Sequence, residues 1–114
     1  MTAGKYDITI ERGSDFTLTL TVKEGGSPKH LGGYMAQADL RKTHEATEKV
    51  SFDFTDSAFD NTGVLIMKMG YAATTTLDAG NYVYDVELAH PNDNTKIRLL
   101  EGKAVVTRDV TRGL

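Results

Sequence analysis

The sequence predicts an all-β protein, an immunoglobulin-like antiparallel sandwich of two sheets with about seven strands. Three observations support this fold class: apolar and polar residues alternate along most of the chain, turn-forming residues recur about every 8 to 12 positions, and almost no segment has helical spacing. The chain has 114 residues, the size of one domain, so we expect a single sandwich over residues 1–114. A closed small barrel is the alternative.

Four segments in the first half of the chain alternate in this way and are expected strands. They are residues 6–10, 16–22, 34–40 and 50–54. In each of them the apolar positions should face the core and the polar positions should face outward. In the second segment this alternation leaves Thr17, Thr19 and Thr21 on the outer face, where a β-branched hydroxyl residue suits a pleated surface.

Three further strands are expected in the second half. They are residues 64–69, 82–88 and 96–107, with a single helical turn at 72–77. In the first of these strands, Leu65, Met67 and Met69 should face the core. The apolar parity changes within the last strand, which predicts a β-bulge near Glu101 and Gly102.

The turn before the penultimate strand has the spacing of a tyrosine corner. In this structural feature a Tyr near the start of the strand donates a hydrogen bond to the backbone at the preceding turn. The residues that would form it here are Asp78, Gly80 and Tyr82. The spacing therefore favours the sandwich over the barrel.

Four apolar residues fall at outward-facing positions of three expected strands. They are Val64, Ile66, Val83 and Val105. If their strands are neighbours, the four side chains form a patch that a monomer rarely leaves exposed, and this patch is a candidate interface with another protein. The alternative is that they are scattered exposed residues, which are common on protein surfaces.

Composition narrows the classes of function. The chain has no Cys, so disulfides, thiolate zinc sites and Cys nucleophiles are excluded. Its formal net charge of −3 disfavours nucleic acid as the main partner. Residues 1–5 lack the features of a signal peptide, and no apolar run approaches the ~20 residues of a membrane span. We therefore expect no membrane association and no targeting segment.

No set of residues predicts an enzyme, a cofactor site or a metal site. The three histidines are far apart in sequence, in expected loops. An oxygen-rich loop could hold calcium but lacks the spacing of a dedicated calcium loop. Two short basic segments are each interrupted by acidic residues. The histidines are His30, His44 and His90. The oxygen-rich loop contains Asp53, Asp56, Asp60 and Asn61. The basic segments contain Arg41 and Lys42, and Arg108 and Arg112.

Several segments resemble a family of small virion proteins of tailed bacteriophages. The similar segments are residues 3–8, 11–16, 31–36, 40–42, 80–88, 98–107 and 110–112, which include the GNYVYDVEL and RLLEGKAVVT stretches. They are patterns of strands and turns without a catalytic signature. The resemblance extends over nearly the whole chain.

The resemblance implies a non-enzymatic, immunoglobulin-like structural protein of the virion, made in the host cytoplasm. It would act in the tail, baseplate or fibre-attachment region, and its partners would be other virion proteins and copies of itself. Decoration of the capsid surface is one alternative. A calcium- or carbohydrate-binding sandwich is another, for which Phe59 beside Asp56 and Asp60 is the only indication.

Overall fold

The structure is a computed structural model that describes residues 4–108. The fold is all-β, with one short helix. Six strands have four or more residues: β2 (Ile8–Glu11), β3 (Phe16–Thr21), β6 (Met35–Arg41), β8 (Val64–Met69), β9 (Gly80–His90) and β10 (Thr95–Thr107). Four strands have two residues each: β1 (Gly4–Lys5), β4 (Lys23–Glu24), β5 (Ser27–Pro28) and β7 (Val50–Ser51). The helix α1 covers Tyr71–Thr74.

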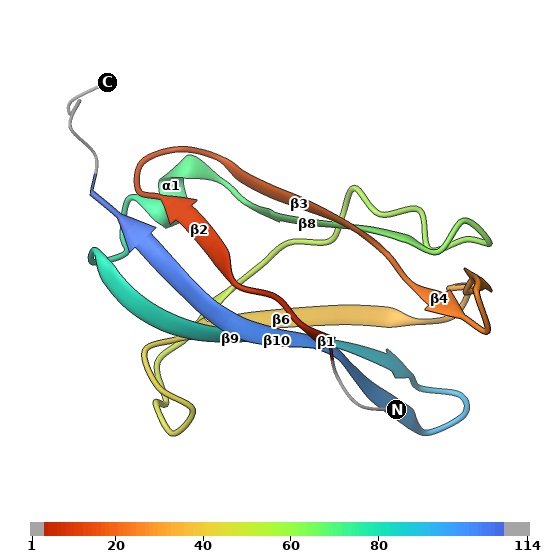
Figure 1. The fold of residues 1–114 in the computed structure, drawn as a ribbon. Helices are drawn as coiled ribbons and strands as arrows, with labels where there is room; N and C mark the ends of the chain where they lie inside the picture. Colours follow the sequence, from red (N-terminus) through yellow and green to blue (C-terminus); the bar gives the residue numbers. More distant parts are fainter. Residues whose placement is uncertain (1–3, 109–114) are drawn as a thin grey trace.

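The strands form two facing layers and a small hairpin (Figure 1). The larger sheet has the order β1-β10-β9-β6-β7, and β2 also pairs with β10. The smaller sheet contains β3 and β8, and the hairpin contains β4 and β5. One apolar core lies between the layers, as expected when each sheet buries one face.

On β8 and β9 the alternation of the sequence correctly predicts which side chains enter this core. On β8, Leu65, Met67 and Met69 are buried, whereas Val64 and Ile66 are only partly buried. On β9, Tyr82 and Tyr84 are buried, and their neighbours face outward. The helical turn is also found close to its predicted place, and Leu77 after it is buried.

The N-terminal strand differs from the expected antiparallel arrangement, because β1 and β2 both run parallel to β10. The two strands are separated at Tyr6 and Asp7. The Tyr6 amide donates to the Glu101 carbonyl (3.0 Å), and the Asp7 carboxylate accepts from the Lys103 amide (3.0 Å). Tyr6 is therefore 52% exposed and does not contribute the core side chain that its parity predicts.

The register of β10 changes at Leu99, not at Glu101 and Gly102 as the sequence analysis expected. Arg98 pairs with Glu87 and Leu100 with Val86, so Leu99 is the extra residue of the bulge. Gly102 has a different role. A Cβ atom there would lie 2.1 Å from the carbonyl oxygen of Tyr6, so only glycine allows the N-terminal segment to come this close.

Residues 50–54, which were expected to form one strand, cross from the larger sheet to the smaller sheet. Only Val50 and Ser51 pair with β6 as β7, after which the Phe52 amide donates to the Ala38 carbonyl (2.9 Å). Asp53 then forms a bridge with Lys68 of β8. Because Phe52 and the following Phe54 are both buried, the segment links the layers through the core.

The bond expected of the tyrosine corner is present. The Tyr82 hydroxyl donates to the Asp78 carbonyl at 2.8 Å, and Tyr82 is 7% exposed. Gly80 between them has a φ of 145°, a conformation that other residues rarely adopt. The turn from α1 into β9 is therefore closed by one side-chain hydroxyl.

Tyr82→Phe should lower the free energy of unfolding by about 1 to 3 kcal/mol, because the partly buried hydrogen bond from the Tyr82 hydroxyl to the Asp78 carbonyl is lost. Denaturant titration of the variant and the wild type measures the change. Tyr71→Phe is the control, since Tyr71 is 63% exposed, and its stability should match the wild type. Equal stability of Tyr82→Phe and Tyr71→Phe would show that the corner bond contributes nothing.

Candidate functional site

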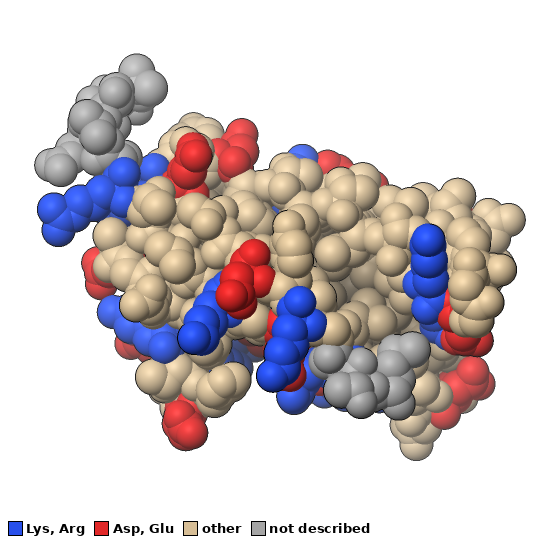
Figure 2. Space-filling model, viewed as in Figure 1, with Lys and Arg blue, Asp and Glu red and all other residues tan. Residues whose placement is uncertain are grey.

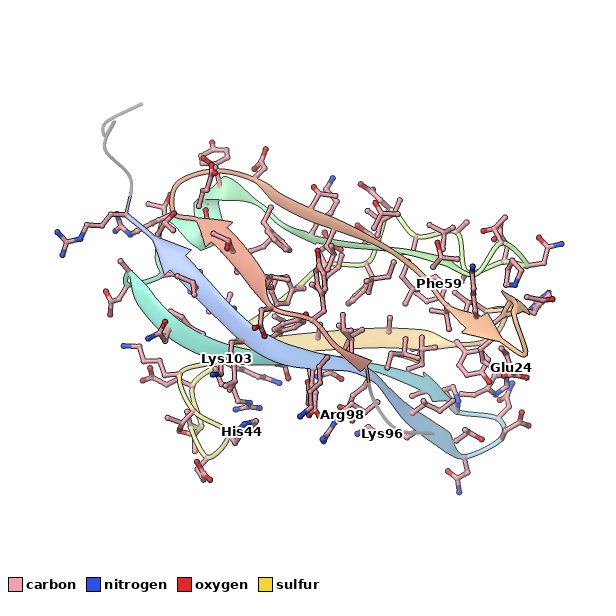
Figure 3. The ribbon with its side chains drawn as sticks, in the orientation of Figure 1. Glu24, His44, Phe59, Lys96, Arg98 and Lys103 are labelled. Atoms are coloured by element: carbon pink, nitrogen blue, oxygen red, sulfur yellow. The ribbon has the colours of Figure 1, made fainter. Side chains whose placement is uncertain are left out.

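The outer face of the larger sheet carries charged side chains that form several ion pairs. Ten of the residues that face outward on β6, β9 and β10 form the set that we call the charged face. It consists of Gln37, Asp39, Arg41, Val83, Asp85, Glu87, Lys96, Arg98, Glu101 and Lys103. Figure 3 shows Lys96, Arg98 and Lys103 on the side of the sheet that points away from β3 and β8.

Three carboxylates lie in a row across the centre of the charged face. Asp39 of β6 is directly opposite Asp85 of β9, and Asp85 is directly opposite Glu101 of β10. Like charges at opposite positions of a sheet destabilise it. The repulsion between these carboxylates is reduced by Arg98, whose guanidinium lies 3.5 Å from the Asp85 carboxylate and 3.7 Å from that of Glu101.

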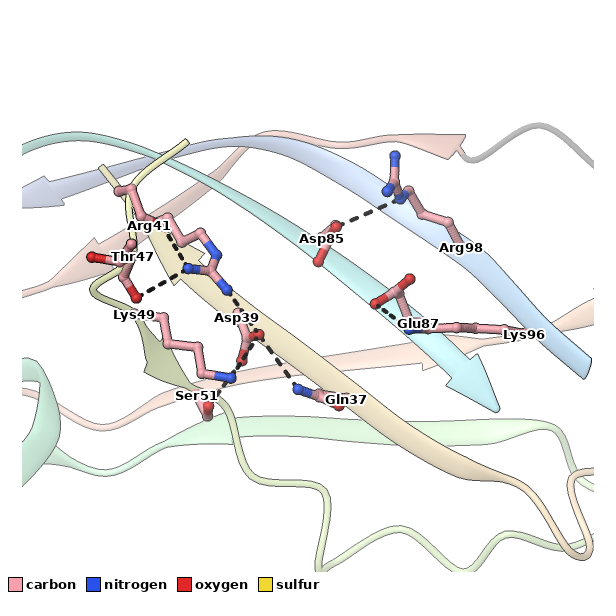
Figure 4. A network of polar contacts seen from close by, with 11 residues as sticks. Gln37, Asp39, Arg41, Thr47, Lys49, Ser51, Asp85, Glu87, Lys96 and Arg98 are labelled. Carbon is pink, nitrogen blue, oxygen red and sulfur yellow. Dashed lines mark hydrogen bonds and ion pairs between the residues drawn. The ribbon is translucent and has the colours of Figure 1, made fainter. Parts of the chain in front are cut away.

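Asp39 is the most enclosed member of the row, with a side chain that is 14% exposed. Its carboxylate accepts a hydrogen bond from the Ser51 hydroxyl of β7 at 2.8 Å. Two cations also approach it, the Arg41 guanidinium at 3.8 Å and the Lys49 ammonium at 3.5 Å (Figure 4). Strand β7 is therefore attached to β6 by side chains as well as by backbone pairing.

Arg41 connects the charged face to the loop at residues 42–49. Its Nη1 atom donates to the carbonyl of Ala46 at 2.6 Å and to that of Thr47 at 3.3 Å. These bonds hold the loop beside the sheet and bring His44 to its margin. His44 is one of the residues that line a depression of about 250 Å³, together with Asp39, Arg41, Val83, Tyr84, Asp85, Arg98 and Glu101.

The Asp85 carboxylate in the depression has a raised pKa. Burial raises the pKa of Asp85 above its ordinary value, and the negative charge of Glu87 raises it further. The cationic Arg98 opposes both effects. The hollow therefore places a partly desolvated acid beside a guanidinium, an arrangement that suits hydrogen bonding to polar groups of a partner.

The four apolar residues proposed as an interface do not come together. Val64 and Ile66 lie on the outer face of β8, in the smaller sheet, whereas Val83 and Val105 lie on the outer face of the larger sheet. The two pairs are therefore on opposite sides of the sandwich. Val83 lines the depression, and Val105 is 42% exposed on β10.

Sequence reasoning did not group the charged residues around Val83 into one site, and named Arg41 only as part of a basic segment. The signal is visible in retrospect, because Asp39, Arg41, Asp85 and Glu87 all fall at outward-facing positions. Their mutual positions follow from the register between β6, β9 and β10, and a single sequence does not contain that register.

The histidines are not gathered into a site. His30 accepts a hydrogen bond from the Gly32 amide, and His44 borders the depression. The expectation of a solvated loop residue is wrong for His90, which ends β9 and has a side chain that is only 16% exposed. Its ring packs edge-on against Tyr34, with centroids 4.8 Å apart.

The carboxylates considered for calcium each have a local partner. Asp56 pairs with the Lys68 ammonium at 2.7 Å. Asp53 accepts from the Thr55 amide, and Asp60 accepts from the amide and hydroxyl of Thr62, and these bonds lower the pKa of both acids. Within residues 4–108, no three acidic or histidine side chains are placed to hold a metal ion. Arg108 is exposed, and Arg112 lies outside the described residues.

The chain was compared with known proteins. No protein-family model matches it, and no curated protein does either. In the part of the chain that the structure describes, no helix is long and apolar enough to cross a membrane.

Asp85→Asn should raise the free energy of unfolding at about pH 7 and leave it nearly unchanged at about pH 3. Folding raises the pKa of Asp85, which means that the folded state disfavours the ionised carboxylate. This penalty disappears at a pH at which the carboxyl group is protonated in both the folded and the unfolded state. Denaturant titrations at the two pH values measure the difference.

The control for this experiment is Glu45→Gln, which alters an exposed carboxylate in the loop 42–49 and should have no effect at either pH. A loss of stability in Asp85→Asn at neutral pH would show that the attraction to Arg98 outweighs the burial of the acid.

Proposed function

We propose that the chain is an immunoglobulin-like, non-enzymatic structural protein of a bacteriophage virion that acts by binding other proteins. The sheet order supports the finer fold. Strands β10, β9 and β6 in one layer and β3 and β8 in the other correspond to strands G, F, C and B, E of an immunoglobulin sandwich. The corner residue Tyr82 lies near the start of β9, the position of strand F.

The charged face is the observation that carries the binding role. It lies on the three longest strands, so its side chains are held by a rigid backbone and present a fixed pattern of charge. Its ion pairs have lengths of 3.5 to 3.8 Å and partly exposed members. Such pairs contribute little to stability, so their groups are available to pair with complementary charges of a partner.

The proposed location in a virion is based on the resemblance of the strand and turn segments to those of small phage virion proteins. We place it in the tail, baseplate or fibre-attachment region, with capsid decoration as the alternative position. Both positions use the same property, a small rigid domain that presents faces and edges to its neighbours.

Particles purified from cells infected with the phage that encodes this chain should contain it in a fixed copy number. Quantitative mass spectrometry of gradient-purified particles measures this number. Lys103→Glu should lower it several-fold, because the substitution reverses an exposed charge of the charged face for which the described residues provide no ion-pair partner.

Lys42→Glu is the matched control. Lys42 is 65% exposed, lies outside the charged face and forms an ion pair with the exposed Asp78. It should be incorporated like the wild type. Particles that lack the chain would contradict the virion role, and equal incorporation of the two variants would contradict the role of the charged face.

Calcium ions and simple sugars should leave the melting temperature unchanged in a thermal-shift titration. A ligand that binds the folded state raises the melting temperature, and the rise increases with ligand concentration. Asp56 and Asp60 already bond to Lys68 and Thr62, so they are not free to bind either ligand. A concentration-dependent rise with either ligand would favour the calcium- or carbohydrate-binding alternative over a purely structural module.

A further inference from the structure

Strand β3 has one free edge. It pairs with β8 on one side, and on its other side no strand of residues 4–108 pairs with it. Strand β2, which precedes it in the chain, pairs with β10 instead. We call the unpaired side of residues 16–21 the β3 edge.

The backbone groups of the β3 edge point away from β8. On β8, the amide and carbonyl of Lys68 bond to Asp53, and those of Ile66 bond to the Ser57 hydroxyl, so both residues direct their backbone groups away from β3. Their partners on β3 are Thr17 and Thr19. In an antiparallel pair, such opposed residues both point outward, and Thr21 does the same by alternation.

The β3 edge has none of the usual protections against pairing. Its sequence, FTLTLT, contains no charge and no proline, the two devices that most often block an exposed strand. Figure 2 shows the surface over β3 as largely uncharged. The core-facing Phe16, Leu18 and Leu20 are only partly buried, whereas Leu65 and Met67 of the neighbouring β8 are completely buried. An added strand would cover them.

We propose that the β3 edge binds the β3 edge of a second copy of this chain, in antiparallel orientation about a two-fold axis. Antiparallel partners share a face of the sheet, so threonines must lie opposite threonines and leucines opposite leucines. Placing Thr19 opposite Thr19 also sets Thr17 opposite Thr21. This register uses all three outward-pointing threonines of each copy and forms about six backbone hydrogen bonds.

The charges that flank the strand favour the same register. With Thr19 on the axis, Asp15 of one copy lies opposite Lys23 of the other, and this contact occurs twice by symmetry. Lys23 is exposed and has no ion-pair partner among residues 4–108. Opposite charges at facing positions stabilise strand pairs, so the only two charged residues immediately bordering the uncharged segment complement each other.

Pairing in this register joins the two small sheets of a dimer into one sheet of four strands, β8-β3-β3-β8. The inference rests on the proposed role as a protein-binding module and identifies one of its partners as a second copy. Its test uses the isolated chain, whereas the virion role is tested on particles, so the two can fail separately.

Single cysteines test the register directly, because the natural chain contains none. Thr19→Cys should form a disulfide-linked dimer under mild oxidation, since residues facing each other across such a pair have Cα atoms about 5.5 Å apart, within the range for a disulfide. Thr17→Cys and Thr21→Cys are matched controls. Each lies opposite a threonine, so its cross-linking should be several-fold slower.

Thr9→Cys tests the rival edge, because Thr9 is an exposed threonine of β2. Non-reducing gel electrophoresis measures the rates, and circular dichroism of the reduced variants shows whether each one folds. Equal rates for the four variants, or faster cross-linking through Thr9, Thr17 or Thr21, would overturn the proposal.

Lys23→Glu provides a measurement that needs no new covalent bond. It places a glutamate opposite Asp15 at both symmetric contacts and should weaken dimerisation about tenfold, as measured by light scattering over a range of concentrations. Lys42→Glu, on a distant loop, should dimerise like the wild type. A wild type that stays monomeric at all concentrations, together with slow cross-linking of Thr19→Cys, would also overturn the proposal.

Discussion

The apolar core between the two sheets is the constraint on which the other surfaces depend. Leu65 and Met67 from β8 meet Val86 and Leu88 from β9 in this core, and all four are completely buried. Successive residues of a strand point to opposite faces, so burying one set forces the other set outward. The positions of the charged face follow directly. The carboxylates of Asp39 and Asp85 face outward because their neighbours are committed to the core.

The two layers are unequal, and this inequality explains the different character of their surfaces. The larger sheet is broad enough to carry a row of carboxylates with the cations that offset it, and its Arg98 serves two acids at once. Within residues 4–108 the smaller sheet consists of β3 and β8, and the crossing segment bonds through Asp53 and Ser57 to the edge of β8 that points away from β3. One edge of β3 is left without a partner strand among residues 4–108. Charge is thus concentrated on one face and unpaired backbone on one edge.

Both surfaces fit a protein that works by contact. A charged face selects among partners through the pattern of its charges, because a mismatched charge is costly even where a matched pair adds little. In the proposed dimer the β3 edge contributes backbone hydrogen bonds that any extended chain could form, and the flanking Asp15 and Lys23 would provide its specificity. The two mechanisms are complementary, and they use different layers of the same domain.

The sequence by itself determined the local features of this protein. Alternation predicted the core side of β8 and β9, and the spacing of Asp78, Gly80 and Tyr82 predicted a bond between residues four apart, because both patterns depend only on neighbours along the chain. Only the tertiary structure decided that β2 runs parallel to β10, that Phe52 crosses between layers, and that Val64 and Val83 lie on opposite sides of the sandwich. These features depend on which distant strands pair. That choice minimises the exposed apolar surface of the whole chain, and so no local segment encodes it.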